Sequence, residues 1–243
     1  AGGEDLVFPH HENEIAQSEA ANEKPFARYW MHNAFLNINN HKMSKSLGNF
    51  FTVRDVSEKY DLQVLRFFML SAHYRSPLNF SEELMEAAGS GYERIVNGVG
   101  NLNYLLENSK SDKISEEEQA LLKEAESYRV KFEQAMEDDF NTADALAAIF
   151  ELVKFANSHA DAEKSAPFLG SLKEEILKLS DICGLIVEKK PELLEEDIEA
   201  LIKERQEARK AKNFGRADEI RKELLDRGII LEDTRERVKW KRA

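Results

Sequence analysis

Residues 81–107, SEELMEAAGSGYERIVNGVGNLNYLLE, carry a helical pattern about seven turns long. Apolar residues recur there at steps of three and four, which places them on one face of a helix: Leu84, Ala88, Tyr92, Ile95, Val99, Leu102 and Leu106. We therefore predict one long amphipathic helix from Ser81 to Glu107. Four glycines interrupt the pattern and indicate close packing against partner helices, at Gly89, Gly91, Gly98 and Gly100.

Three more helical patterns follow, and each has a start signal. Ser115 with Glu118 three residues later forms a capping box, and Asn141 is a favoured N-cap residue. A further pattern begins at Pro167, a residue that suits the first turn of a helix. Together the four helices predict an antiparallel bundle over residues 81–187 and a mainly α fold.

The composition is that of a helix-rich protein without membrane spans. The chain has 243 residues, 33% of them charged, and a net charge of -12; its mean hydropathy is -0.55. There is no apolar run of about 18 residues and no signal-peptide pattern, and the single Cys183 excludes an internal disulfide. We expect a cytoplasmic monomer in which Cys183 is a buried hydrophobic residue.

The acidic balance also limits how the chain can bind nucleic acid. A protein that coats RNA or DNA through its general field needs a basic surface, which a net charge of -12 opposes. Basic residues are nevertheless dense at the C-terminus, where residues 235–243 hold five basic side chains and one acidic one. Any contact with nucleic acid is therefore expected to be local.

Residues 42–49, KMSKSLGN, predict a loop that handles phosphate. A strand expected at residues 35–38 leads into it. Lys42, Ser44, Lys45 and Ser46 offer ammonium and hydroxyl donors that suit negative charge developing on phosphate oxygens. On these grounds alone a solvated connector remains open, because loops rich in lysine and serine are common.

The N-terminal segment holds a candidate metal pair. The sequence predicts a short strand at Leu6 to Phe8 and a helix from His10 to Ala21. His10 and Glu14 lie four residues apart, so both side chains share one helical face and could hold one metal ion. A surface pair with no metal is the alternative, because two ligands do not complete a zinc site.

Residues 52–73 predict two shorter helices. Thr52 and Asp61 are their caps, and an apolar stripe is expected on the second helix, at Leu62, Leu65, Phe68, Met69 and Ala72. Arg66 and Arg75 could touch RNA, or they could form salt bridges on the surface.

The C-terminal part predicts a separate module. A charged segment with a proline, residues 188–196, is expected to be a linker. Beyond it we predict two helices, at residues 198–212 and 213–228, then two strands, at residues 229–233 and 238–241. Such a small α+β module would be marginally stable alone.

Four blocks of the chain resemble the cysteinyl-tRNA synthetase family, which belongs to class I of the aminoacyl-tRNA synthetases. They are the GG-DL-FPHHENE-AQS segment at residues 2–18, the KMSKS letters at residues 42–46, the DDFNTADAL run at residues 138–146, and the residues 208–240 that include GIILEDT and Trp240. The blocks occur in the order of the family and are spread along nearly the whole chain, which is far more specific than one motif.

The resemblance implies four parts. They are the end of a Rossmann-type catalytic domain at residues 1–35, the KMSKS loop and stem-contact segment at residues 36–80, a bundle with a DALR-type signature at residues 81–187, and an anticodon-binding module at residues 197–243. It implies a cysteine–tRNA ligase, which joins cysteine to ATP and passes the cysteinyl group to tRNA(Cys).

The resemblance also assigns roles by position. Lys42 and Lys45 would be catalytic, and Ser44, Lys45 and Ser46 would bind ATP, with Mg²⁺ accompanying it. His10 and Glu14 would bind a zinc ion that selects cysteine by its thiolate. The anticodon would be read by Arg209, Phe214, Asp218, Asp233 and Trp240.

Two features leave other interpretations open. The family's HIGH signature and its two cysteine zinc ligands would lie upstream of Ala1, so we expect this chain alone to be inactive. A non-catalytic RNA-binding or scaffold protein is therefore one alternative, and an amino-sugar cysteine ligase is another, which the anticodon-like module disfavours. Within that module, Asp218 and Arg209 could belong to a salt-bridge network while Phe214 packs under the hairpin.

Overall fold

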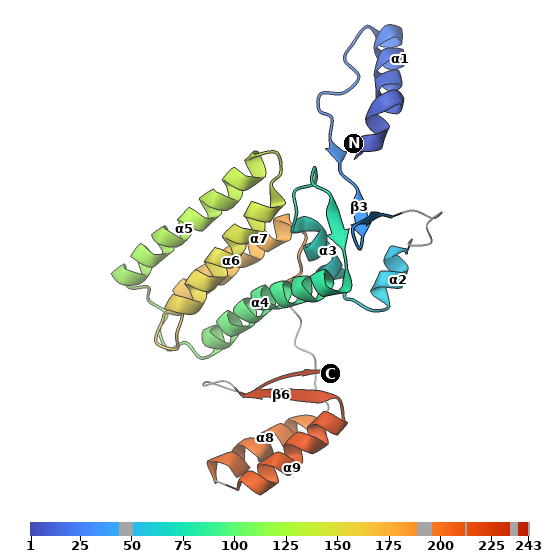
Figure 1. The fold of residues 1–243 in the computed structure, drawn as a ribbon. Helices are drawn as coiled ribbons and strands as arrows, with labels where there is room; N and C mark the ends of the chain where they lie inside the picture. The colour runs from blue at the N-terminus through green and yellow to red at the C-terminus, as the bar shows by residue number, and fades with distance from the viewer. Residues whose placement is uncertain (44–50, 189–195, 212, 234–237, 243) are drawn as a thin grey trace. The chain divides into compact units, whose positions relative to one another are not determined.

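The chain forms two compact units, residues 1–189 and 190–243, in a computed structural model (Figure 1). The structure describes residues 1–43, 51–188, 196–211, 213–233 and 238–242. Helices dominate both units, so the mainly α fold is confirmed. None of the helices in the described ranges combines the length and apolar character that crossing a membrane requires.

Four helices make the bundle of the first unit. They are α4 (Glu82–Glu107), α5 (Glu116–Glu137), α6 (Thr142–His159) and α7 (Ala166–Ile182). Each runs opposite to the one before it, as expected (Figure 1).

Local capping explains where the bundle helices begin. The hydroxyls of Ser81 and Ser115 each accept a hydrogen bond from a backbone amide in the first turn, and Ser115 and Glu118 complete a capping box. The side chain of Asn141 does the same for α6. The predicted caps at Ser115 and Asn141 are confirmed. Helix α7 is capped by Ser165, two residues before the proline on which its prediction depended.

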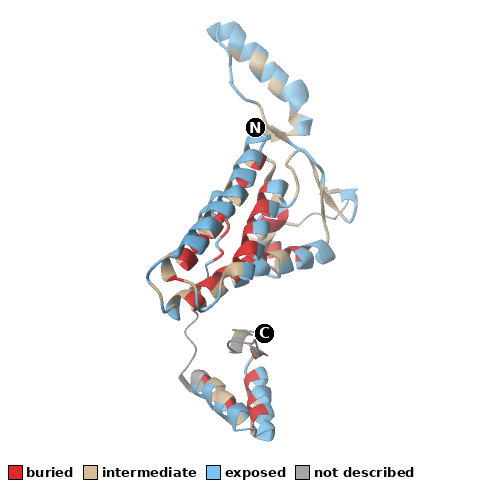
Figure 2. Cartoon of the chain, turned by 90° about the vertical axis from the view of Figure 1, so that its left-hand side faces the viewer, coloured by how far each residue is buried: buried red, intermediate tan, exposed pale blue. Residues whose placement is uncertain are grey.

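The core of the first unit lies between the facing sides of these helices, where Figure 2 shows the buried residues in red. Its fully buried side chains include Ile95, Leu102, Phe132, Ile149, Leu152, Phe168, Leu172 and Ile176. Gly98 marks a close contact, because a Cβ atom there would lie 2.6 Å from Cγ1 of Val153. Gly100 differs, since a Cβ atom there would meet nothing within 4 Å, so the packing interpretation holds for only part of the glycines.

A small sheet and two helices lie against one end of the bundle. The sheet has the order β4-β3-β5, with β3 (Leu36–Ile38), β4 (His41–Lys42) and β5 (Leu78–Phe80). Strand β3 pairs antiparallel with β4 and parallel with β5. The helices are α2 (Val53–Ser57) and α3 (Leu62–Leu70), which the side chains of Thr52 and Asp61 cap as predicted.

The predicted stripe on α3 is partly wrong. Phe67 and Phe68 are its buried residues, whereas Leu62 and Met69 are each 48% exposed. Gln63 and Arg66 mark the polar side of α3, and Leu62 and Met69 lie next to Arg66 on the helix, so the stripe was predicted too close to that side.

The N-terminal segment also differs from expectation. The strand β1 (Gly2–Gly3) pairs in parallel with β2 (His32–Asn33), and helical turns at Glu4–Leu6 and Val7–His11 replace the strand predicted at Leu6 to Phe8. They lead directly into α1 (Glu12–Asn22). Glu4 and Asp5 at the first turn explain part of the difference, because acidic residues stabilise the start of a helix.

The second unit contains the helices and strands that the sequence predicts. Helices α8 (Glu196–Lys210) and α9 (Phe214–Asp226) precede an antiparallel hairpin of β6 (Ile229–Asp233) and β7 (Val238–Arg242). Its small core consists of Ile198, Ile220, Leu224, Ile229 and Leu231, with Leu201, Ile202 and Trp240 packed against it.

Candidate functional site

The β3–β4 hairpin brings the chain to Lys42. Asn39 and Asn40 turn it with φ values of 49° and 64°, a left-handed pair that suits a two-residue hairpin and that asparagine tolerates well. The amide of Asn40 donates to Oδ1 of Asn79 at 2.7 Å, which fixes the turn to the segment of β5. Lys42 pairs with Asn37 in the register of the hairpin. Ser44, Lys45 and Ser46, predicted to bind ATP, lie outside the described residues.

The chain after residue 50 returns to the same sheet. The ring of Phe51 lies 4.6 Å from the ring of Phe80 on β5, centroid to centroid. Thr52 and Asp55 then form a capping box at the start of α2, and the hydrogen bond from the Thr52 amide lowers the pKa of Asp55. Lys42, where the KMSKS letters begin, and Phe51 are therefore both held at this sheet.

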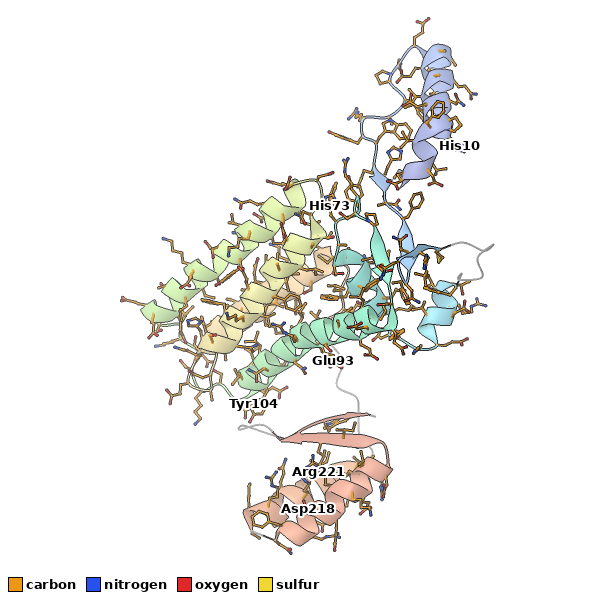
Figure 3. All side chains as sticks on the ribbon, viewed as in Figure 1. His10, His73, Glu93, Tyr104, Asp218 and Arg221 are labelled. Carbon is orange, nitrogen blue, oxygen red and sulfur yellow. The ribbon has the colours of Figure 1, made fainter. Side chains whose placement is uncertain are left out.

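His10 and Glu14 lie near the start of α1, and both are exposed. Figure 3 shows His10 at that end of the helix. A structural zinc site takes four ligands. Across the ranges that the structure describes, no three His, Cys, Asp or Glu side chains gather closely enough to hold a metal ion. These residues alone therefore do not fit a zinc ion, and the ligand role of His10 and Glu14 stays a prediction.

The structure instead gathers His11, His32 and Trp30. Nδ1 of His11 lies 2.8 Å from Nε2 of His32, and the Trp30 ring lies 4.9 Å from the His11 ring. The close passage of Gly2 past the His11 ring fits its lack of a side chain, since a Cβ atom there would lie 3.0 Å from Cε1 of that ring. The parallel pairing of β1 with β2 brings His11 and His32 together, although they lie 21 positions apart in the chain.

The two arginines of the segment 36–80 each contact another part of the same unit. Nε of Arg66 donates to the carbonyl of Cys183 at 2.8 Å, next to Gly184, which has a positive φ of 65° and ends α7. Nε of Arg75 lies 2.6 Å from Oδ2 of Asp139. Of the two interpretations of these arginines, the structure therefore favours internal contacts.

The second unit presents Phe214 and Asp218 one turn apart on α9. This spacing puts them on one face of the helix, and Phe214 is 60% exposed, so it does not pack under the hairpin. Asp218 is exposed and, among the residues that the structure describes, forms no hydrogen bond or ion pair (Figure 3). Arg209 is exposed in the last turn of α8.

Two salt bridges of this unit are made by Arg216, a residue for which the sequence analysis predicted no role. Arg216 contacts Glu204 at 2.9 Å and Glu219 at 3.2 Å, which joins α8 to α9. Trp240 lies opposite Leu231 in the hairpin and packs against the small core. Asp233 pairs with Val238 in the backbone register of the same hairpin. Phe214 and Asp218 are thus available on the surface, whereas Trp240 contributes to the core.

Three family models match the chain. Residues 1–90 match the tRNA synthetases class I (C) catalytic domain, residues 131–188 match the DALR domain, and residues 192–240 match the cysteinyl-tRNA ligase anticodon binding domain. They follow the order in which the sequence blocks occur.

Curated relatives match the whole chain. It is 63% identical over 243 residues to a cysteine–tRNA ligase of Lachnospira eligens, and it covers 52% of that relative. It is 55% identical to the ligase of Lachnoclostridium phytofermentans and 53% identical to that of Clostridioides difficile, covering 53% and 52% of them. The chain therefore spans about half the length of the curated relatives it matches.

The fold has a solved counterpart. It is similar to a leucyl-tRNA synthetase chain in a crystal structure of a ternary complex from Agrobacterium radiobacter K84, with a TM-score of 0.56 and 20% identity over 76% of this chain and 27% of that one. At this identity the similarity concerns the fold alone. With three family models in order and relatives at 53% to 63% identity along its whole length, the chain belongs to the cysteinyl-tRNA synthetase family.

Proposed function

We propose that the chain works as part of a cysteine–tRNA ligase of the length of its relatives, carrying the KMSKS letters and the tRNA-binding parts. The observation that carries this proposal is the 63% identity, along the whole chain, to the cysteine–tRNA ligase of Lachnospira eligens. The reaction would join cysteine to ATP, release pyrophosphate, and transfer the cysteinyl group to tRNA(Cys). One cysteine, which is free and buried, suits the reducing cytoplasm.

In this proposal Lys42 and Lys45 act on the phosphates of ATP. Their ammonium groups would stabilise the negative charge that grows as pyrophosphate leaves, with Ser44 and Ser46 as hydroxyl donors and Mg²⁺ bound to the nucleotide. A group that acts mainly in the transition state changes the rate more than the binding of substrates.

The test of this part uses the complete ligase and Lys45→Ala. Cysteine-dependent exchange of pyrophosphate into ATP should fall by about 100-fold or more, with the KM for cysteine changed little. Lys24→Ala, an exposed lysine of the first unit, is the control and should leave the rate unchanged. A normal rate for Lys45→Ala would remove Lys45 from the mechanism.

The second unit would read the anticodon, which is GCA for cysteine. Single-stranded bases are recognised by stacking on aromatic rings and by hydrogen bonds to their edges. Phe214 offers an exposed ring on which a base can stack. One helical turn further along α9, the exposed carboxylate of Asp218 can accept hydrogen bonds from the edge of a guanine. Arg209 would donate to a base, and Asp233 and Trp240 would support the same surface.

Asp218→Ala tests this role. The variant should weaken binding of tRNA(Cys) by about 1–3 kcal/mol and change little for a tRNA with a substituted first anticodon base. The matched control is Asp226→Ala, which removes one negative charge from the exposed end of the same helix and should affect both tRNAs equally. Equal losses on both tRNAs for Asp218→Ala would show that this carboxylate does not read a base.

In this proposal a zinc ion binds only when residues outside this chain supply its remaining ligands. His10 and Glu14 would supply two of the four, so the 243-residue chain should lose zinc to a chelator during dialysis. Metal analysis after dialysis measures this. A full equivalent of retained zinc would mean that other residues of the chain complete the site.

A further inference from the structure

The turn between α5 and α6 is conformationally costly. Asp139 and Phe140 both have a φ of 55°, a left-handed conformation that side chains with a Cβ atom adopt at a cost. Phe140 is 51% exposed, so burial of its ring does not offset that cost. The side chain at the other left-handed position, Asp139, contacts Tyr74 and Arg75.

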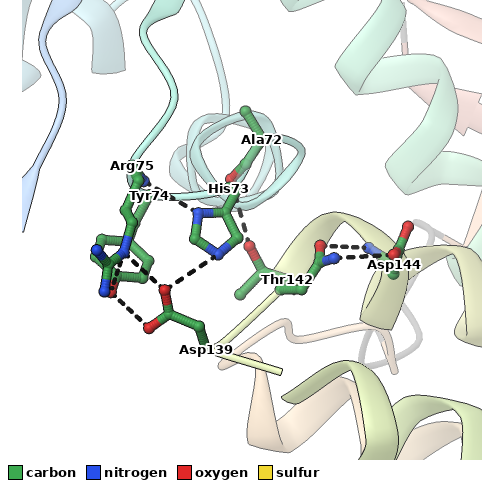
Figure 4. Close-up of polar contacts among 8 residues, drawn as sticks. Ala72, His73, Tyr74, Arg75, Asp139, Thr142 and Asp144 are labelled. Atoms are coloured by element: carbon green, nitrogen blue, oxygen red, sulfur yellow. Dashed lines mark hydrogen bonds and ion pairs between the residues drawn. The ribbon is translucent and has the colours of Figure 1, made fainter. Parts of the chain in front are cut away.

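Asp139 reaches a segment 65 residues earlier in the chain, His73 to Arg75 (Figure 4). Its Oδ1 accepts from the Tyr74 hydroxyl at 2.7 Å, and its Oδ2 lies 2.6 Å from Nε of Arg75 and 3.9 Å from Nε2 of His73. Nε of Arg75 also donates to the Tyr74 hydroxyl at 3.0 Å. The hydrogen bond from Tyr74, with Arg75 beside it, holds the pKa of Asp139 below its ordinary value.

The same segment is continuous with the small sheet. The carbonyl of Tyr74 accepts from the amide of Ala34 at 2.9 Å, and the amide of Leu78 donates to the carbonyl of Phe35 at 3.1 Å. Strands β3 and β5 then pair in parallel, and β4 follows β3 through the Asn39–Asn40 turn. A contact at Tyr74 and Arg75 therefore restrains the position of β3, and through β3 that of β4, which ends at Lys42.

We propose that Asp139 is a positioning residue, which holds the β4-β3-β5 sheet against the α5–α6 turn and so sets the place at which the chain enters the KMSKS sequence at Lys42. The proposal rests on the proposed function for its catalytic consequence, because only in a ligase does the position of that sequence affect activation. Apolar packing of α3 and of the sheet residues Leu36, Leu78 and Phe80 joins the same regions, and the Thr142 hydroxyl donates to the Ala72 carbonyl at 3.4 Å. To these contacts Asp139 adds the polar ones that fix the segment His73 to Arg75.

Amide exchange in the 243-residue chain tests the positioning directly. Asp139→Asn keeps the size of the side chain and its tolerance of the left-handed conformation, while it removes the charge and replaces one acceptor oxygen with an NH2 donor. Exchange of the Ala34 and Leu78 amides should accelerate by about two- to fivefold, because the surface contact that closes the segment is weakened. The Leu152 amide, in a fully buried stretch of α6, should not change.

Glu151→Gln is the matched control. Glu151 lies on α6, forms an ion pair with Lys131 of α5, and has a side chain that is 50% exposed against 43% for Asp139. This variant removes the same charge without touching the segment, so Ala34 should exchange at the wild-type rate. Unchanged exchange of Ala34 and Leu78 in Asp139→Asn, or equal acceleration in Glu151→Gln, would overturn the proposal.

The complete ligase gives a second readout. Asp139→Asn should lower kcat for cysteine activation by about two- to fivefold, the factor by which the contact that closes the segment is weakened, and it should leave the KM for cysteine unchanged. An unchanged kcat would contradict the positioning role. A wild-type ligase with no activity would contradict the proposed function instead, and amide exchange would then decide the positioning role by itself.

Discussion

Replacing Glu118 by alanine should destabilise the first unit strongly. Glu118 is only 4% exposed, and its carboxylate joins two helices. Oε1 accepts from the Ser165 amide at 2.8 Å, and Oε2 accepts from the Ser115 amide and the Ser165 hydroxyl, also at 2.8 Å. One side chain thus caps α5 and stabilises the start of α7.

The magnitude follows from what the truncation leaves unpaired. Ser165 is 1% exposed, so its amide and hydroxyl lose a partner that water does not readily replace, at about 1–3 kcal/mol. Loss of the capping box at the exposed Ser115 adds about 0.5–1 kcal/mol. We expect a total of about 2–4 kcal/mol in the free energy of unfolding.

Urea unfolding followed by far-ultraviolet circular dichroism measures this change. The second unit has a separate core, so its transition serves as an internal reference. Glu117→Ala is the control, because the Glu117 side chain is 79% exposed and only 3.8 Å from Lys164, a surface pair worth about 0–0.5 kcal/mol. Equal effects of the two substitutions would refute the argument that the buried carboxylate stabilises the helix ends.

The pH dependence of the Glu118→Ala effect has a definite sign. Burial raises the pKa of Glu118, but the amides of Ser165 and Ser115 and the Ser165 hydroxyl more than offset it, so the pKa lies below its ordinary value of 4.5. A carboxylate with a lowered folded pKa stabilises the protein above the unfolded pKa and loses this contribution as the pH falls through the folded pKa. The difference between wild type and variant should therefore be complete at pH 7 and smaller at about pH 3.

Three further outcomes are expected from the same chain. Gly98→Ala should cost about 1–3 kcal/mol of stability in the urea titration, because the new methyl group would lie 2.6 Å from Val153; a neutral result would mean that the helices separate easily. Gly100→Ala, with open space at the same helix, should instead stabilise α4 by up to about 1 kcal/mol, and a loss would contradict the assignment of open space. Burial raises the pKa of the Cys183 thiol, so a thiol reagent should label it slowly in the native chain and rapidly in urea; rapid native labelling would show that Cys183 is accessible.

Much of the helical architecture could be predicted because its signals are local. Ser81, Ser115 and Asn141 start their helices through hydrogen bonds to residues three positions away. Most of the buried face of α4 was predicted as well, at Ala88, Tyr92, Ile95, Val99 and Leu102. The predicted Leu84 is 43% exposed, however, and Met85 and Leu105 are buried instead. The family could likewise be recognised from short contiguous motifs, above all KMSKS at residues 42–46.

The site could be predicted only in part. The sequence places Phe214 and Asp218 one helical turn apart, but their exposure depends on the hairpin and α8, which pack on the opposite side of α9. The choice between an RNA contact and an internal contact for Arg75 likewise required the position of Asp139.

The amino-acid sequence was sufficient to predict where the helices begin, which family the chain resembles and which residues could carry its chemistry. Capping and periodicity operate within about four residues, so they do not depend on the rest of the fold. The folded chain was needed to show which of the many apolar residues of α3 are buried, and that His11 meets His32 and Asp139 meets Tyr74. These contacts join residues 21 and 65 positions apart, and only the packing of strands and helices brings such residues within hydrogen-bonding distance.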